Sequence, residues 1–221
     1  MSLSPVSSSP SHPRFERLPF GLLLALAGGS LDGYTYLNRG QVFATAETGN
    51  LVMLGAHLVR GEPALHYLPP ILAFAAGVLS AELLRSFLLR RKLPLDWRQC
   101  ILLLECCVVA IAAFTPLGDW DLLANVLISF TSAIQVESFR VIAGCGCATT
   151  MCTGNLRAGT ENLLLRLRQG DRAAGRKAAV YYALIFAFVA GAILSGLLTP
   201  ILAGRTALLP CLLFLAAVIL F

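Results

Sequence analysis

Long runs of apolar residues are the feature of this chain that most limits how it can fold. The clearest runs are residues 102–114, 178–200 and 206–221. A helix needs about 20 mostly apolar residues to cross the hydrocarbon core of a bilayer, and each run approaches or meets that length. Because 57% of the 221 residues are hydrophobic and only 13% are charged, a single soluble core could not bury these runs. The sequence predicts an all-α integral membrane protein.

Residues 1–17 lack this apolar character. The first thirteen are rich in Ser and Pro and contain almost no side chain that could pack, which predicts a disordered cytoplasmic tail. The tail also lacks the basic start, short apolar stretch and small-residue cleavage site of a secretory signal. The first hydrophobic segment, from residue 18, is therefore expected to be retained as a membrane anchor.

Charged and reactive residues argue against several classes of function. The net charge is +5, but Lys and Arg are clustered without interleaved aromatic residues, so no nucleic-acid partner is expected. The seven Cys residues lie mostly in apolar runs, where Cys behaves as a small hydrophobe. Cys145 and Cys147 have no His or second Cys pair at ligand spacing, so no metal, other cofactor or catalytic residue is assigned. A membrane enzyme that acts through Cys145, Cys147 or Cys152 is the least favoured hypothesis, because no enzyme motif is present.

Two blocks of sequence occur twice. Thr-Gly-Asn-Leu at 48–51 recurs at 153–156, and at the same offset of 105 residues Asp32 falls on Glu137. The second block recurs in the same order at an offset of 114: Tyr67, Ala73, Phe74, Ala76, Gly77, Leu83 and Leu84 correspond to Tyr181, Ala187, Phe188, Ala190, Gly191, Leu197 and Leu198. The chain is therefore predicted to contain two related halves.

Each half, repeat A at residues 18–115 and repeat B at 116–221, contains four hydrophobic segments of one membrane domain. Their approximate bounds are 18–38, 44–60, 64–89 and 99–115, then 121–143, 148–166, 177–199 and 205–221. The second segment of each half is short and polar, which is costly for a helix that faces lipid. We therefore predict six transmembrane helices and two short re-entrant or broken helices.

The positions of Lys and Arg predict the orientation of the spans. If all eight segments crossed, one of the two basic clusters, at 90–98 or 166–177, would have to lie outside the cell. With six spans, both clusters and both termini lie in the cytoplasm, the side that Lys and Arg favour. Three spans per half give the halves opposite orientations, which is the inverted-repeat plan of many secondary transporters.

The repeated motifs supply six candidate substrate-binding residues: Thr48, Gly49, Asn50, Thr153, Gly154 and Asn155. Irregular backbone is tolerated at membrane depth only where it is buried in protein or lines a cavity. The Thr residues can cap the following turn, the Gly residues permit close backbone approach, and the Asn residues offer donors and acceptors. The free N–H groups at such a helix start could hold a polar or anionic group. In the alternative interpretation, Asn only stabilises the helix break by bonding to neighbouring backbone.

Three charged residues complete the candidate site: Asp32, Glu137 and Arg140. Asp32 lies far enough into the first segment that it should face the interior of the bundle. In the functional interpretation Asp32 binds a proton or a cation, while Glu137 and Arg140, three positions apart, form a gating or structural pair. In the alternative both acids are paired only structurally, Asp32 for example with Arg39.

Other polar residues in the apolar segments are weaker candidates. Glu47 has Cys152 as its counterpart; it is either a second titrating group or, as we favour, a residue at the aqueous mouth of the pocket. Glu105 and Gln135 could simply bridge helices. His57 is expected near a membrane interface, because no second ligand stands at a helical spacing from it.

From about residue 18 onward the chain resembles the YoaK family of bacterial membrane proteins, also called DUF1275 or UPF0700. The residues that carry the resemblance are the stretch 28–40 with Leu31-Asp32-Gly33, Thr48-Gly49-Asn50 with Gly55, and Gln135 followed by Arg140 and the run 149–156. The family commonly has Met before the first Thr-Gly-Asn, where this chain has Glu47, and that departure argues against one substrate for the whole family. The resemblance implies a polytopic protein of the bacterial inner membrane and no particular chemistry.

These features favour a small secondary carrier of the bacterial inner membrane. Its site would lie between the halves, with Asn50 and Asn155 at the helix tips and Asp32 coupling binding to protonation. The expected partners are membrane lipids and a small polar or anionic solute, and a homo-oligomer is compatible with the sequence. The alternative is a non-transporting scaffold or accessory subunit, in which the small faces around Gly28 and Gly77 join helices or partners.

Overall fold

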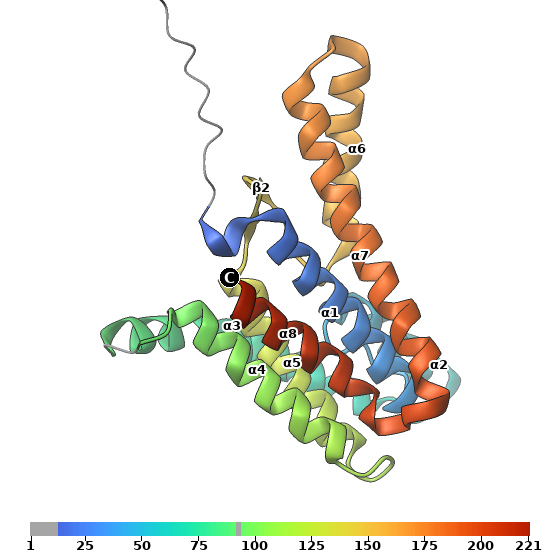
Figure 1. The fold of residues 1–221 in the computed structure, drawn as a ribbon. Helices are drawn as coiled ribbons and strands as arrows, with labels where there is room; N and C mark the ends of the chain where they lie inside the picture. Colours follow the sequence, from blue (N-terminus) through green and yellow to red (C-terminus); the bar gives the residue numbers. More distant parts are fainter. Residues whose placement is uncertain (1–12, 92–93) are drawn as a thin grey trace, which may run out of the picture.

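Eight α-helices make up most of the described part of the polypeptide (Figure 1). The computed structural model describes residues 13–91 and 94–221. The α-helices are α1 (Leu18–Asn38), α2 (Glu47–Arg60), α3 (Leu68–Arg90), α4 (Trp97–Phe114), α5 (Asp121–Ser138), α6 (Cys152–Gln169), α7 (Arg172–Leu202) and α8 (Leu208–Leu220). The shorter elements are the 3-10 helices η1 (Arg14–Glu16), η2 (Leu65–Tyr67) and η3 (Ala203–Ala207) and the hairpin of β1 (Val141–Ile142) and β2 (Cys145–Gly146). The predicted helical fold is confirmed, and each expected hydrophobic segment contains one α-helix.

Three helical stretches are long and apolar enough to cross a membrane: Leu65–Arg90, Trp97–Phe114 and Arg172–Leu220. The third contains both α7 and α8. Helix α7 alone has 31 residues, which extend about 46 Å at the rise of an α-helix. That length exceeds the roughly 30 Å of a hydrocarbon core, so α7 reaches beyond it.

Helix α1 packs along α7 in a parallel pair that takes one helix from each half of the chain. A Cβ atom at Gly29 of α1 would overlap the carbonyl oxygen of Phe188, and Gly191 of α7 lies as close to the backbone of α1. Further along the pair, Asn38 Nδ2 donates a hydrogen bond to Thr199 Oγ1 at 3.0 Å. Small residues at such a crossing let two backbones approach closely, which is how helices gain van der Waals contact in lipid.

Helix α3 packs along α5 in a second pair of the same kind. A Cβ atom at Gly77 of α3 would overlap the carbonyl oxygen of Phe130 and would lie 2.7 Å from the Cβ of Ala133. Gly77 and Gly191 are counterparts in the repeated sequence. In both pairs, therefore, the first helix of one half lies beside the third helix of the other half.

Helices α4 and α8 run antiparallel and join the two pairs, because α4 also packs on α5 and α8 on α1. Near one end of this contact, Gln99 Nε2 donates to the carbonyl oxygen of Val218 at 3.1 Å. In its middle, the Cys106 thiol donates to the Cys211 carbonyl oxygen at 3.6 Å and the Cys211 thiol to the Cys106 carbonyl oxygen at 3.5 Å. These two Cys residues are 105 positions apart, so they are counterparts that contact each other reciprocally.

Both ends of the described chain lie at one end of the bundle, which we call the terminal end (Figure 1). There the ring of Phe20 in α1 lies 5.6 Å from the ring of Phe221, between centroids, and 5.4 Å from the ring of Phe15. The tail expected at 1–17 is thus ordered from residue 14, where η1 begins. Its residues before 13 lie outside the described part of the chain.

The opposite end is fastened by Arg39, which directly follows α1 and is fully buried. Its Nε donates to the Tyr34 hydroxyl at 2.7 Å, and one terminal nitrogen donates to the Asp121 carboxylate at 2.8 Å. The remaining bonds, of 2.6 to 2.8 Å, reach carbonyl oxygens at the end of α4: Ala112, Thr115 and Pro116. The suggested pairing of Asp32 with Arg39 is therefore wrong, because Arg39 is committed to α4 and α5.

Helices α6 and α7 form a hairpin that projects past the rest of the bundle at the terminal end (Figure 1). Its turn uses Gly170 at φ 70°, a left-handed conformation that residues with a Cβ atom rarely adopt. Asp171 then caps α7 by accepting hydrogen bonds from the N–H groups of Ala174 and Ala173. These bonds lower the pKa of the Asp171 carboxyl, because they favour its ionised form.

Candidate functional site

Two short segments precede α2 and α6: the first segment includes residues 43–46 and the second includes residues 148–151. An Asn side chain bonds to the backbone of each segment. Before α2, Asn50 Oδ1 accepts from the Phe43 N–H at 2.9 Å and Nδ2 donates to the Phe43 carbonyl oxygen at 2.7 Å. Before α6, Asn155 makes the same two bonds to Ala148, at 3.4 Å and 2.6 Å. Phe43 and Ala148 are counterparts at the offset of 105, so the local geometry repeats with the sequence. This arrangement matches the interpretation in which Asn stabilises the helix start.

Replacing either Asn by Ala is expected to lower the free energy of unfolding by about 1–3 kcal/mol, because a buried backbone N–H and C=O lose their partner. Asn162→Ala is the matched control for Asn155→Ala, since Asn162 lies on the same helix and bonds only to Ala158 one turn back. Thermal unfolding of purified variants in detergent measures the effect. Equal stability of Asn155→Ala and Asn162→Ala would contradict this role.

Helix α1 holds the first segment from its other side. Asp32 Oδ1 accepts a hydrogen bond from the Thr45 N–H at 2.8 Å, and Thr35 Oγ1 accepts one from the Ala44 N–H at 3.3 Å. Asp32 is only 5% exposed, as expected for an acid that faces the interior. The segment is therefore clamped between α1 and α2 by side chains that bind its backbone.

Glu47, the first residue of α2, turns its carboxyl group into the interior. Its Oε2 accepts from Asn50 Nδ2 at 2.8 Å, and the carboxylate lies close to the Ser129 hydroxyl of α5. Its Oε1 is buried without a hydrogen-bond partner among the described residues. Glu47 as a whole is half-buried, so its favoured placement at the aqueous mouth of a pocket stays a prediction.

The second segment also reaches α1. A Cβ atom at Gly28 would lie 2.9 Å from Thr150 Cγ2 and 3.3 Å from the Thr149 carbonyl oxygen, so the missing side chain makes room for this segment. Cys152, which begins α6, lies near Asp32. The segments from the two halves thus meet on the same stretch of α1.

We call the group formed there the central polar cluster; its members are Asp32, Thr45, Glu47, Ser129 and Thr150. The hydroxyls of its Thr and Ser residues, with Glu47 Oε1, are buried and make no hydrogen bond of good geometry in the part of the chain that the structure describes. The Thr45 hydroxyl lies close to the Asp32 carboxyl group, and the Ser129 hydroxyl lies close to that of Glu47. Buried polar groups are nearly always paired, and an unpaired one needs a water, an ion or a ligand to satisfy it. The cluster is therefore the candidate site for a small molecule that donates and accepts hydrogen bonds.

The remaining residues of the two motifs lie outside this cluster. Helices α2 and α6 begin at Glu47 and Cys152, one residue before Thr48 and Thr153, and neither helix start has a side-chain cap. The expected capping by these Thr residues is therefore wrong, and both are exposed on the outside of the bundle. Gly49 packs against the Phe43 ring, which a Cβ atom would approach to 2.6 Å, whereas a Cβ atom at Gly154 would meet nothing within 4 Å.

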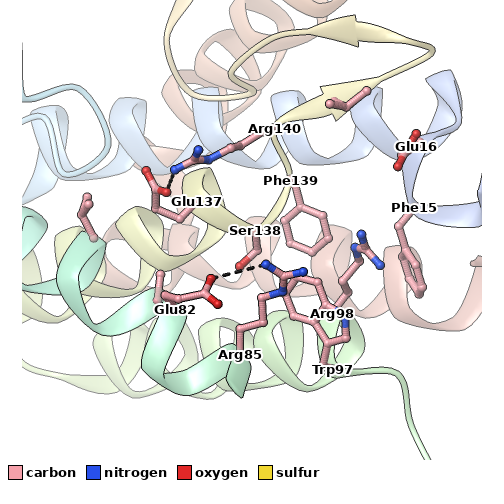
Figure 2. A pocket seen from close by; sticks show the side chains of 13 residues that line it. Phe15, Glu16, Glu82, Arg85, Trp97, Arg98, Glu137, Ser138, Phe139 and Arg140 are labelled. Carbon is pink, nitrogen blue, oxygen red and sulfur yellow. Dashed lines mark hydrogen bonds and ion pairs between the residues drawn. The ribbon is translucent and has the colours of Figure 1, made fainter. Parts of the chain in front are cut away.

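Glu137 and Arg140 lie away from the cluster, at the terminal end. They form an ion pair, as the sequence suggested, and line a cavity there (Figure 2). Asp32 and its counterpart Glu137 are thus not brought together.

Sequence inspection missed Thr45, Ser129 and Thr150 as members of the cluster. A single hydroxyl in an apolar helix or next to a motif carries no signal of its own, since Ser and Thr commonly bond to backbone within their own helix. Thr45 and Thr150 are counterparts at the offset of 105, and that repetition was the one signal that could have found them.

Comparison with known proteins agrees with the apolar helices of the structure. The profile of DUF1275, described as a protein of unknown function, matches residues 20–221. The UPF0700 transmembrane protein YoaK of Bacillus subtilis (strain 168) is 28% identical over 153 residues, which cover 66% of this chain and 66% of that protein. No solved structure matches the chain. Because the family profile spans all but the first 19 residues, the chain belongs to the DUF1275 family of membrane proteins.

Proposed function

We propose that this protein is a secondary carrier of the bacterial inner membrane for a small polar solute that binds at the central polar cluster. One observation carries the proposal: segments from both halves meet at buried polar groups that lack partners within the described residues. A scaffold would gain nothing from leaving such groups unsatisfied, because each costs free energy in a membrane protein as in a soluble one.

The pairing of helices supports an inverted repeat. Helix α1 packs on α7 as α5 packs on α3, and α1 packs on α8 as α5 packs on α4. Two halves related by a two-fold axis would give this set of reciprocal pairs, and counterparts near the axis would touch, as Cys106 and Cys211 do. In the proposed topology α1, α3, α4, α5, α7 and α8 span the membrane, while α2 and α6 begin at its centre and are re-entrant.

The distribution of basic residues supports a cytoplasmic location for the terminal end. The projecting α6–α7 hairpin at that end carries a group of cations: Arg166, Arg168, Arg172, Arg176 and Lys177. Lys and Arg near the ends of membrane helices favour the cytoplasmic side. Both ends of the described chain would then face the cytoplasm.

The chemistry of the central polar cluster favours some classes of solute over others. The cluster has two carboxyl groups, those of Asp32 and Glu47, and its members include no Lys or Arg. Nearby carboxylates repel an anion and attract a cation or a hydrogen-bond donor. We therefore favour a small cationic or donor-bearing neutral solute over the anionic one that the helix starts alone suggested.

Flux into proteoliposomes tests the function. We expect stopped-flow light scattering to show transport of at least one probe among methylammonium, urea and glycerol, and weaker transport of formate. Ser129→Ala and Glu47→Gln should each lower that flux about ten-fold, the equivalent of one lost hydrogen bond to the solute. Two matched controls should leave it unchanged: Glu62→Gln at an exposed position, and Ser80→Ala at a half-buried position of α3 whose hydroxyl donates to the Ala76 carbonyl oxygen of the same helix.

Two results would overturn the proposal. Equal flux in Ser129→Ala, Glu47→Gln and their controls would remove the central polar cluster from the transport path. Absence of flux for every probe, together with a protein that co-purifies in fixed stoichiometry, would favour the accessory-subunit alternative.

A further inference from the structure

A cavity of about 290 Å³ lies at the terminal end, where α3 and α5 meet η1 and the first residues of α4 (Figure 2). Its walls carry three acids and three Arg residues: Glu16, Glu82, Glu137, Arg85, Arg98 and Arg140. None of these residues belongs to the central polar cluster, so the cavity is a separate feature. Because the chain contains two related halves, the α1/α7 pair has a position that is equivalent to this cavity.

The α1/α7 pair is in direct contact at the position that corresponds to the α3/α5 cavity. Ala81 and Ser138 line the cavity, and their counterparts in the repeated sequence are Ser195 and Gly33. A Cβ atom at Gly33 would lie 3.1 Å from the Ser195 Cβ, so these counterparts are in contact. One turn beyond Ser195, the Asn38–Thr199 hydrogen bond of 3.0 Å closes the end of the pair.

In both helix pairs, α3/α5 and α1/α7, the two backbones are in close contact near the middle of the pair. The Gly77 crossing holds α3 against α5, and the Gly191 crossing holds α7 against α1, each with backbone against backbone. A crossing without intervening side chains lets two helices pivot while they remain in contact. Each pair can therefore be open or closed at its end without separating at its centre.

The charged side chains on the α3 and α5 walls of the cavity form ion pairs within their own wall, and they could form pairs across the cavity instead. Glu82 and Arg85 pair within α3 at 3.3 Å, and Glu137 pairs with Arg140 on the other wall. Arg85 is held in the open position by Trp97, whose ring centre lies 5.3 Å from its guanidinium carbon. If the α3 and α5 walls approached, Arg85 would meet Glu137 and Arg140 would meet Glu82, and these pairs would replace the local ones.

We infer that the α3/α5 cavity and the closed end of the α1/α7 pair are the two alternating gates of the carrier. In the state described, the α3/α5 gate at the terminal end is open. It closes when Arg85 bonds to Glu137 and Arg140 bonds to Glu82, while the α1/α7 gate opens by loss of the Asn38–Thr199 hydrogen bond. This inference rests on the proposed carrier function, but gate movement can be measured without any flux.

Disulfide trapping in the full chain tests the movement. Ala81→Cys with Ser138→Cys should cross-link under mild oxidation in vesicles, because closure brings these positions together as Gly33 and Ser195 are now. The bond is identified by peptide mass spectrometry with the native Cys residues retained. Leu83→Cys with Ser138→Cys is the negative control, since Leu83 is 74% exposed on the outside of α3, and Asn38→Cys with Thr199→Cys is the positive control.

The exchange of partners predicts how charge changes alter the cross-linking rate. Arg85→Glu should slow formation of the 81–138 bond about ten-fold by setting two acids against each other, and adding Glu137→Arg should restore the rate. Arg85→Gln provides a milder variant with a smaller slowing. Absence of the 81–138 bond while the 38–199 bond forms, or no rescue by the second charge change, would overturn the gate. Absence of flux in the wild-type protein, together with normal formation of the 81–138 bond, would instead count against the proposed function.

Discussion

Arg39→Met is expected to give a protein that is extracted in low yield and unfolds at a much lower temperature than the wild type. The change leaves the Asp121 carboxylate and three carbonyl oxygens at the end of α4 without their cationic partner. Removing one member of a buried ion pair typically costs about 3–5 kcal/mol, and here several hydrogen bonds are lost with it. Thermal unfolding followed by intrinsic fluorescence in detergent measures the change.

Two further variants separate charge from geometry at this position. Arg39→Lys keeps the charge but has three donors in place of five, so it should recover only part of the stability. Arg60→Met removes an exposed Arg at the end of α2 and should unfold like the wild type. A stable Arg39→Met protein with native gel-filtration behaviour would show that the opposite end is held by other contacts.

Gly191→Ala should produce the second large loss of stability. The added Cβ would overlap the Leu26 carbonyl oxygen and lie 2.9 Å from the Ser30 amide nitrogen, so α1 and α7 must move apart along their whole contact. Overpacking of this kind costs about 1–3 kcal/mol and can cost more where the obstacle is backbone. The measurement is the same unfolding experiment, with gel filtration to detect dissociated or aggregated protein.

Gly196→Ala is the matched control on the same helix. The new Cβ would meet only Leu37 Cδ1, at 3.7 Å, which is an ordinary contact. Ala also forms helix better than Gly, by about 1 kcal/mol in an exposed helix, so this variant should be as stable as the wild type or slightly more stable. Equal losses at 191 and 196 would indicate that glycine acts through helix flexibility and not through the crossing.

The helices were predictable because their causes are local. Runs of apolar residues as long as those at 102–114 and 178–200 have few alternatives to a helix, and the observed α4 and α7 contain them. The repeat offset also predicted a detail of the contacts: Asn50 and Asn155 make the same pair of bonds to backbone. What the sequence could not provide was the choice of partner helix, because the contacts of α1 with α7 join residues that are far apart in the chain.

The wrong predictions for Arg39, Thr48 and Thr153 also have physical causes. Asp32 and Arg39 are two helical turns apart, which suggested a pair on one face, but α1 ends at Asn38 and the backbone of Arg39 leaves the helix. Its side chain can therefore reach the end of α4 instead. The Thr48 and Thr153 hydroxyls were expected to cap helices that in fact begin one residue earlier, so they lie inside the first turn. The neighbour of the Glu47 carboxylate, Ser129, comes from the other half of the chain.

Because the helices that α1 packs along, α7 and α8, both belong to repeat B, α1 enters the membrane before its main packing partners have been synthesised. More than 130 residues are synthesised between Asn38 and the start of α7. During that interval the glycine-rich surface of α1 and the Asp32 carboxyl need temporary cover from lipid, the insertion machinery or a chaperone. Translation of the second half is thus the step that completes the first, and a ribosome that stalled before α7 would leave an incomplete bundle for membrane proteases to remove.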